Sequence, residues 1–82
     1  MGVLIMKTVK VRLSSIEAVR DFVDAVRKYD SEIDLASGRY VVDAKSIMGI
    51  FSLDLLSPIT LTAQSDDTAE LFAAIDRFIV KD

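Results

Sequence analysis

The 82-residue sequence contains no histidine, no cysteine and no tryptophan. Without cysteine it can form neither a disulfide framework nor a thiolate metal site. Without histidine it lacks the commonest transition-metal ligand and the usual general base near neutral pH. We therefore expect no metal ion, no cofactor and no enzymatic activity.

Glycine and proline are scarce, with three of the former and one of the latter. Half of the residues, 51%, are hydrophobic and 28% are charged. This composition is typical of globular proteins and argues against disordered or linker sequence. The length suits one small hydrophobic core, so we expect residues 1–82 to form a single domain.

Positive charge is also in short supply, because the net charge is −3 and the isoelectric point is about 4.8. Proteins dedicated to nucleic acids normally carry a basic patch, so nucleic acid is not an expected partner. The apolar run Val3-Leu4-Ile5-Met6 ends at Lys7 and is too short for a signal peptide or a membrane span. We expect a cytoplasmic protein without membrane insertion.

The first part of the chain predicts a strand followed by a helix. Apolar and charged residues alternate up to Leu13, which favours a half-buried strand over about 4–13. Ser14 with Glu17 forms a possible capping box, and Ser15 is an equally good N-cap. Apolar residues three and four apart then predict an amphipathic helix from about 16 to 29. Its apolar stripe consists of Ile16, Val19, Phe22, Val23, Val26 and Tyr29.

The remainder predicts two short strands, a short helix, a strand and a final helix. The strands near 33–35 and 40–42 are joined by a tight turn at Ser37-Gly38. Ser46 is the expected N-cap of a helix from 47 to about 53, and Pro58 opens the next strand. Asp66, Asp67 or Thr68 can cap the last helix, whose apolar stripe runs from Leu71 to Ile79.

The predicted order β-α-β-β-α-β-α defines an α+β fold. Strands with one polar and one apolar side indicate an antiparallel sheet with one solvated face. We therefore predict a two-layer open-faced sandwich, in which three helices cover one face of a four-stranded antiparallel sheet.

The residues Ala44 to Leu53, A-K-S-I-M-G-I-F-S-L, resemble the second-helix signature of HPr proteins, the phosphocarriers of the sugar phosphotransferase system. That signature reads K-S-I-M-G, two hydrophobic residues and S-L. The segments 27–30 and 59–61 also resemble HPr sequence in the right order. Because the predicted element order is that of HPr, the resemblance extends over nearly the whole chain and implies an HPr-like fold.

The active-site loop departs from this pattern. HPr proteins read approximately G-[I/L]-H-A-R-P before the first helix, where the histidine accepts phosphate and the arginine steadies it. An ungapped comparison sets Ser15 at the histidine and Glu17 at the arginine, whereas a one-residue shift sets 16–19 against I-H-A-R. Neither register supplies a histidine or a facing arginine, and Glu17 would repel phosphate. Histidine phosphotransfer by the family's route is thus excluded.

The sequence is similar to a histidine-less branch of the family, the catabolite-repression HPr-like proteins. The resemblance implies regulatory phosphorylation of the serine that opens the second helix, which is Ser46 here. It implies two protein partners, a bifunctional HPr kinase/phosphorylase that modifies this serine and a LacI-type transcription regulator that reads it. It further implies an apolar docking patch of Ile47, Met48 and Phe51, with Arg20 as a basic contact on the first helix.

Three functions remain open at this point. The leading hypothesis is a regulatory protein-interaction module of the sugar phosphotransferase and catabolite system, switched at Ser46. The alternative is a degenerate HPr-like domain with a structural role, as a homodimer or a transporter-complex subunit assembled through Met48, Phe51 and Leu55. A small-molecule or enzymatic domain has least support, since no titratable cluster converges in the sequence. Ser46 also has the simpler interpretation of a helix cap alone.

Overall fold

The computed structural model describes residues 6–64 and 68–81. None of the helices in these ranges is long and apolar enough to cross a membrane. The predicted order of elements is confirmed, and Asp66 and Asp67, two of the proposed caps, lie outside the described residues. The elements are β1 (Met6–Val11), α1 (Ile16–Val26), β2 (Glu32–Ser37), β3 (Tyr40–Asp43), α2 (Ile47–Phe51), β4 (Ile59–Gln64), α3 (Thr68–Ala74) and a 3₁₀ turn (Asp76–Phe78).

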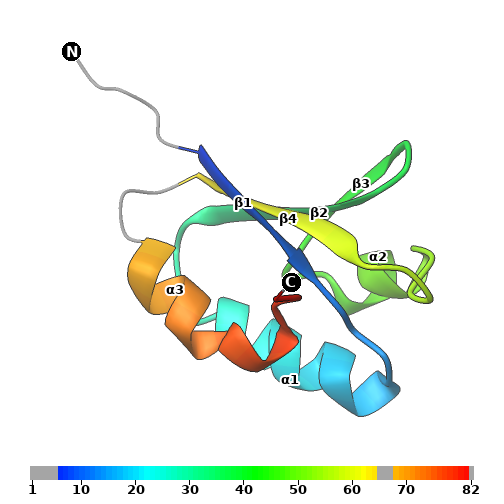
Figure 1. The fold of residues 1–82 in the computed structure, drawn as a ribbon, viewed down its shortest axis with the longest axis horizontal. Helices are drawn as coiled ribbons and strands as arrows, with labels where there is room; N and C mark the ends of the chain where they lie inside the picture. The colour runs from blue at the N-terminus through cyan, green and yellow to red at the C-terminus, as the bar shows by residue number, and fades with distance from the viewer. Residues whose placement is uncertain (1–5, 65–67, 82) are drawn as a thin grey trace.

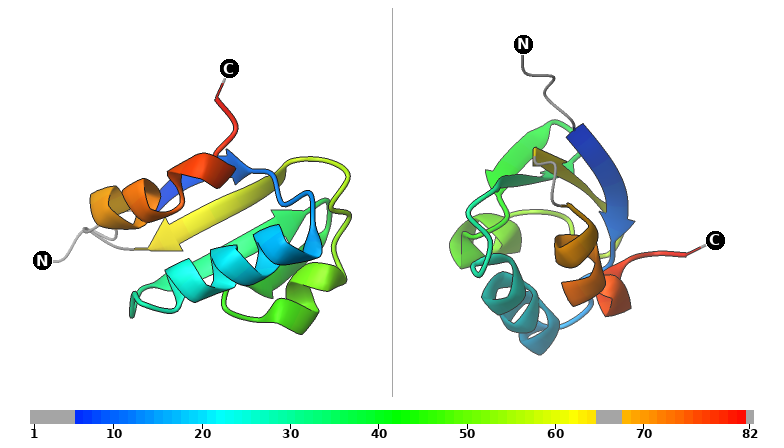
Figure 2. Two further views of the ribbon diagram at one scale, coloured as in Figure 1. Left: turned by 90° about the horizontal axis from the view of Figure 1, so that it is seen from below. Right: turned by 90° about the vertical axis from the view of Figure 1, so that its left-hand side faces the viewer.

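The strands form one antiparallel sheet in the order β1-β4-β2-β3. The β2–β3 hairpin turns at Gly38, whose φ of 60° is a backbone conformation that glycine adopts without strain. The three helices lie together on one face of the sheet, and the other face carries no helix within the described residues (Figures 1 and 2). The predicted α+β open-faced sandwich is confirmed.

The hydrophobic core lies between the sheet and the helices. Along β4 every second residue is buried, from Ile59 through Leu61 to Ala63, as expected for a strand with one covered face. From α1 the side chains of Val19, Phe22, Val23 and Val26 are buried against that face. The ring of Phe22 meets that of Phe78 edge to face, with centroids 5.7 Å apart.

The first helix begins where it is predicted to begin and ends earlier than predicted. Ser15, and not Ser14, is the N-cap, because its hydroxyl accepts a hydrogen bond from the Ala18 amide at 3.0 Å. The helix ends at Val26 and the chain to Tyr29 continues as a tighter turn, in which the Tyr29 amide donates to the Val26 carbonyl. Ile16 was predicted within the buried stripe but is 65% exposed. It faces the loop after α2 instead of the sheet.

The last helix is also shorter than its apolar pattern predicts. After Ala74 the chain forms the 3₁₀ turn and then extends along β1. The Arg12 amide donates to the Phe78 carbonyl and the Val80 amide donates to the Lys10 carbonyl, each at 2.8 Å. Because these bonds require an extended backbone beside β1, the helix cannot continue to Ile79.

The Phe22–Phe78 contact gives a test of the core. Phe22→Ala should lower the free energy of unfolding by about 3–5 kcal/mol, because it removes a fully buried ring and leaves a cavity. Urea denaturation followed by circular dichroism measures the change. Ile16→Ala, at an exposed position of the same helix, should change it by less than about 0.5 kcal/mol. Equal effects of the two substitutions would contradict this packing.

Candidate regulatory and partner-binding site

Ser46 caps the short helix α2, as the sequence predicts. Its hydroxyl oxygen accepts a hydrogen bond from the Gly49 amide at 3.1 Å, and its backbone is extended, with φ −103° and ψ 106°. The Ser46 amide donates to the Asp43 carbonyl at 3.0 Å, which closes the turn between β3 and α2. The residue is half-buried, and its hydrogen bond to the Gly49 amide is partly buried as well.

Gly49 brings α2 close to β3. A Cβ atom at this position would lie 3.1 Å from Cβ of Val42 and 3.2 Å from the Ser46 hydroxyl oxygen. The next residue, Ile50, is fully buried and is the side chain that fixes the helix to the core. The glycine therefore allows a five-residue helix, too short to be stable alone, to dock on the sheet.

Lys45 ties the start of α2 to the end of α1. Its ammonium group donates to the Tyr29 carbonyl at 2.6 Å, and its own carbonyl accepts from the Arg27 guanidinium at 3.3 Å. Its amide donates to the Asp43 carboxylate at 2.8 Å. Three hydrogen bonds thus fix the residue directly before Ser46.

The patch predicted after Ser46 is divided by the fold. Met48 is 81% exposed and Phe51 is 41% exposed, so both project from α2 into solvent. Ile47 is half-buried and packs against the core, so it contributes to anchoring the helix as well as to its surface. This division follows from helical geometry, because a single turn can present only one side to the sheet.

A groove of about 300 Å³ joins this region to the segment before α1. One wall of the groove consists of Phe51 from α2 and of Leu55 and Leu56 from the loop after it. Leu56 is 92% exposed. Leu13, Ser14, Ser15 and Ile16 supply the other wall. The fold therefore brings the degenerate loop together with Phe51 of the α2 patch, whereas Ile47 and Met48 do not line the groove. We call the four exposed side chains Ile16, Met48, Phe51 and Leu56 the apolar surface.

Sequence reasoning missed two members of this surface. Ile16 fits the helical stripe by spacing and so was predicted to be buried. Leu56 is not among the patch residues that the resemblance implies, although the nearby Asp54 and Ser57 indicate a solvated loop. In the structure the Leu56 amide donates to the Asp54 carboxylate at 3.0 Å, which fixes this loop.

The degenerate loop carries no basic side chain of its own. Ser15 is engaged as a helix cap, and Glu17 is exposed in the first turn of α1. Arg20 is exposed and follows Ile16 by four residues, so the two share one side of the helix. Arg20 does not line the groove.

Two arginines that the sequence interpretation did not assign to the loop lie beside it. Arg12 and Arg77 line a second pocket of about 410 Å³, together with Ser14. The Arg77 guanidinium pairs with the Asp21 carboxylate at 3.3 Å and lies 4.6 Å from the centroid of the Phe78 ring. Nothing in the sequence spacing indicates this placement, because Arg77 is brought to the loop by the 3₁₀ turn.

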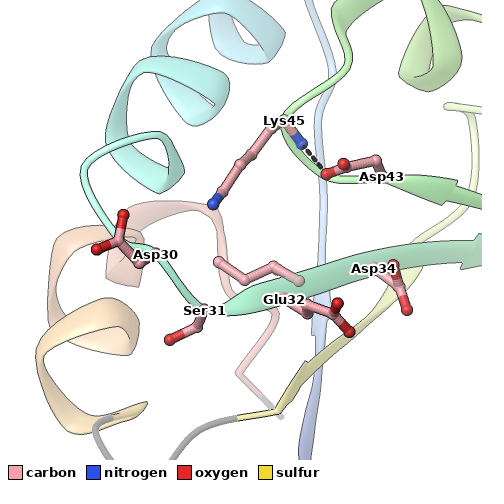
Figure 3. Close-up of a pocket in the computed structure, with 7 residues that line it drawn as sticks. Asp30, Ser31, Glu32, Asp34, Asp43 and Lys45 are labelled. Atoms are coloured by element: carbon pink, nitrogen blue, oxygen red, sulfur yellow. Dashed lines mark hydrogen bonds between the residues drawn. The ribbon is translucent and has the colours of Figure 1, made fainter.

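A third pocket, of about 270 Å³, lies at the end of α1 and the start of β2 (Figure 3). The Lys45 side chain extends along one wall of this pocket, with its ammonium group directed away from Asp43. Glu32 and Asp34 of β2 line the opposite wall. Within the described ranges no three histidine, cysteine, aspartate or glutamate side chains are grouped to hold a metal ion.

Comparisons with known proteins agree with this architecture. The family model "PTS HPr component phosphorylation site" matches residues 8–81. The chain belongs to the HPr family. Members of this family are phosphocarriers that act through other proteins and are not themselves enzymes. The present member has the family fold without any histidine in the sequence given.

Solved HPr structures are similar over nearly their full length. Phosphocarrier protein HPr from Bacillus anthracis str. Ames is 29% identical, with a TM-score of 0.68, covering 96% of this chain and 100% of its own. HPr-C-His from Thermoanaerobacter tengcongensis is 30% identical, with a TM-score of 0.70 and coverages of 89% and 88%. Crh, the catabolite-repression HPr of Bacillus subtilis, is 29% identical, with a TM-score of 0.62 and coverages of 95% and 99%.

The contact at Gly49 predicts the effect of a side chain there. Gly49→Val should lower the free energy of unfolding by about 1–3 kcal/mol, because the added methyl groups overlap Val42 and the Ser46 hydroxyl. Thermal and urea unfolding measure this change. In a Val42→Ala background the additional loss from Gly49→Val should be smaller. A loss of the same size in both backgrounds would contradict the close approach.

Proposed function

We propose that this protein is a regulatory protein-interaction module of the phosphotransferase and catabolite-repression system, switched by phosphorylation of Ser46. The observation that carries this proposal is the position of Ser46 beside an outward-facing apolar surface, in an HPr-family chain without histidine. The module acts as a single domain in the cytoplasm and has no enzymatic activity of its own.

The surroundings of Ser46 support a phosphate that adds charge without unfolding the helix. A phosphoserine carries close to two negative charges, which backbone amides at a helix start stabilise. The Arg27 guanidinium is bonded to the carbonyl one residue before Ser46 and adds positive charge nearby. The negative charge of the Asp43 carboxylate would repel the phosphate, but this carboxylate already accepts a hydrogen bond from the Lys45 amide. The phosphate therefore alters the surface charge next to Met48 while the fold is retained.

The apolar surface and Arg20 supply the contacts for a partner. Exposed methionine and phenylalanine side chains are common at protein interfaces, and arginine is enriched there. The likeness to Crh, named for catabolite repression, supports a LacI-type transcription regulator as the reader and an HPr kinase/phosphorylase as the modifying enzyme. Ser15 and Glu17, at the degenerate loop, border this interface without transferring phosphate.

Phosphorylation can be tested directly. Incubation with ATP and an HPr kinase/phosphorylase should increase the intact mass by one phosphate, because Ser46 is only half-buried and opens a helix. Ser46→Ala should show no increase. Ser52→Ala is the matched control, since this serine lies at the other end of α2 and bonds the Gly49 carbonyl, and it should be modified like the native protein.

An unchanged mass of the native protein, or phosphate on Ser46→Ala, would contradict this proposal. Because Ser46→Ala also removes the cap and should cost about 1 kcal/mol, its melting temperature must be measured to show that it remains folded.

Partner binding can be tested with the phosphorylated protein and a LacI-type regulator. Met48→Ala and Phe51→Ala should each weaken the affinity about tenfold or more, because exposed side chains of this size act as interface anchors. Tyr40→Ala, at another exposed aromatic position on β3, is the control and should change it less than about twofold. Isothermal calorimetry measures the affinities. Equal binding by all three variants would contradict an interface at the apolar surface.

The exposure of Met48 and Leu56 also favours a second candidate, a structural role in a homodimer or a transporter complex. In that case assembly depends on Met48, Phe51 and Leu55 and is indifferent to phosphate at Ser46. Binding measured with and without the phosphate therefore separates the two functions.

A further inference from the structure

The end of α1 and the start of α2 are joined by a hydrogen bond that is exposed to solvent. Arg27 caps the C-terminal end of α1, and its guanidinium donates to the Lys45 carbonyl at 3.3 Å. The two residues are 18 positions apart in the sequence, and the two helices lie side by side (Figure 2). Because Lys45 directly precedes Ser46, this bond places a guanidinium group beside the serine that opens α2.

The guanidinium group is within reach of a phosphate attached to the Ser46 hydroxyl. The peptide bond between Lys45 and Ser46 is trans, so the Lys45 carbonyl oxygen and the Ser46 hydroxyl oxygen are at most about 5 Å apart. A phosphate adds three acceptor oxygens beyond the hydroxyl. Arg27 has five N–H donors, and among the described residues its side chain bonds only the Lys45 carbonyl. Donors therefore remain for a phosphate.

The other charged groups near Ser46 are already engaged. The Lys45 ammonium group donates to the Tyr29 carbonyl at 2.6 Å in a partly buried bond, which directs it away from Asp43 (Figure 3). The Asp43 carboxylate accepts from the Lys45 amide and carries the same sign of charge as a phosphate. The Arg27 bond is exposed and longer than usual, whereas arginine binds phosphate strongly through two parallel N–H bonds. Exchange of the carbonyl for a phosphate is therefore favourable for Arg27.

We propose that Arg27 is the phosphate-binding residue of the switch, and that phosphorylated Ser46 pairs with Arg27 and thereby joins α2 to α1. This inference rests on the proposed phosphorylation of Ser46 and adds an internal binding residue to it. Because α2 has only five residues, an additional ion pair at its first turn holds it more firmly on the core. The phosphate then also steadies the helix that presents Met48 and Phe51 to a partner.

Phosphoserine incorporated at position 46 during protein synthesis tests the pair without any kinase. A guanidinium beside the phosphate favours its dianion, so the second pKa of the phosphate should be lower in the native background than in Arg27→Ala, by about 0.5–1 pH unit. Titration followed by phosphorus NMR measures both values. The Asp43 carboxylate, the Lys45 ammonium group and the backbone amides of α2 are present in both proteins, so the difference reports the contribution of Arg27.

Thermal unfolding of the same proteins tests the link between the helices. Replacing serine by phosphoserine at position 46 should change Tm more favourably in the native background than in Arg27→Ala, by about 2–6 °C. High salt should reduce this difference, because the pair is exposed. With serine at position 46, Arg27→Ala should have a smaller effect on Tm, since it removes only an exposed bond to a carbonyl.

Arg39→Ala is the matched control. Arg39 is also an exposed arginine, but it lies in the turn before β3, at the opposite end of that strand from Ser46. Its removal should leave the phosphate pKa and the effect of phosphoserine on Tm unchanged. Arg27→Lys keeps the positive charge without the planar guanidinium, so it should retain about half of the pKa difference. Circular dichroism shows whether each variant is folded.

The outcomes separate the Arg27 pair from the proposed function. Equal phosphate pKa values and equal Tm changes in the native and Arg27→Ala backgrounds overturn the pair and leave the switch at Ser46 in place. Equal effects of Arg27→Ala and Arg39→Ala overturn it as well, because net charge then explains them. A phosphoserine protein that does not fold also contradicts it. If the pair forms but an HPr kinase/phosphorylase adds no phosphate to the native protein, the pair stands and the proposed function fails.

Discussion

The arrangement of the candidate site depends on the contact between Gly49 and Val42. Because no side chain separates α2 from β3 at this position, the helix lies close enough to the sheet for Ile50 to be buried. With that side of the helix fixed to the sheet, Met48 must project into solvent. A single backbone approach therefore determines both the anchoring of the helix and the side of it that is exposed.

The structure also explains how an HPr fold persists without the family's reactive loop. Ser15, which an ungapped comparison sets at the histidine, contributes to the fold by capping α1. Ile16, next to it, extends the hydrophobic region of α2 across the groove toward Phe51. Ile16 thus gives this loop an apolar side toward α2, while Arg12 and Arg77 line a separate pocket together with Ser14. The start of α1 therefore has an apolar groove on one side and a pocket with two arginines on another.

Most of the fold could be predicted from local patterns. The alternation along β4 and the spacing of Phe22 and Val26 on α1 each indicate which side of the element is buried. The Ser46 cap depends only on residues that are close in the sequence. The predictions were wrong where hydrogen bonds or contacts with distant parts of the chain determine the local structure. The apolar stripe toward Ile79 continues at helical spacing, yet bonds to β1 hold that segment extended. The groove could not be predicted, because it joins residues about forty positions apart whose proximity depends on the docking of α2.

The extended segment after the 3₁₀ turn has a consequence for the edges of the sheet. It pairs with the last part of β1, through Arg12 and Lys10, so that this stretch of the edge is already hydrogen-bonded. Edge-to-edge polymerisation requires two free edges on each molecule, and long unpaired edges are templates for fibres. Here β3 is short, with four residues, and ends at Asp43. The extended segment after the 3₁₀ turn therefore shields the Lys10–Arg12 part of the β1 edge from open-ended β-aggregation.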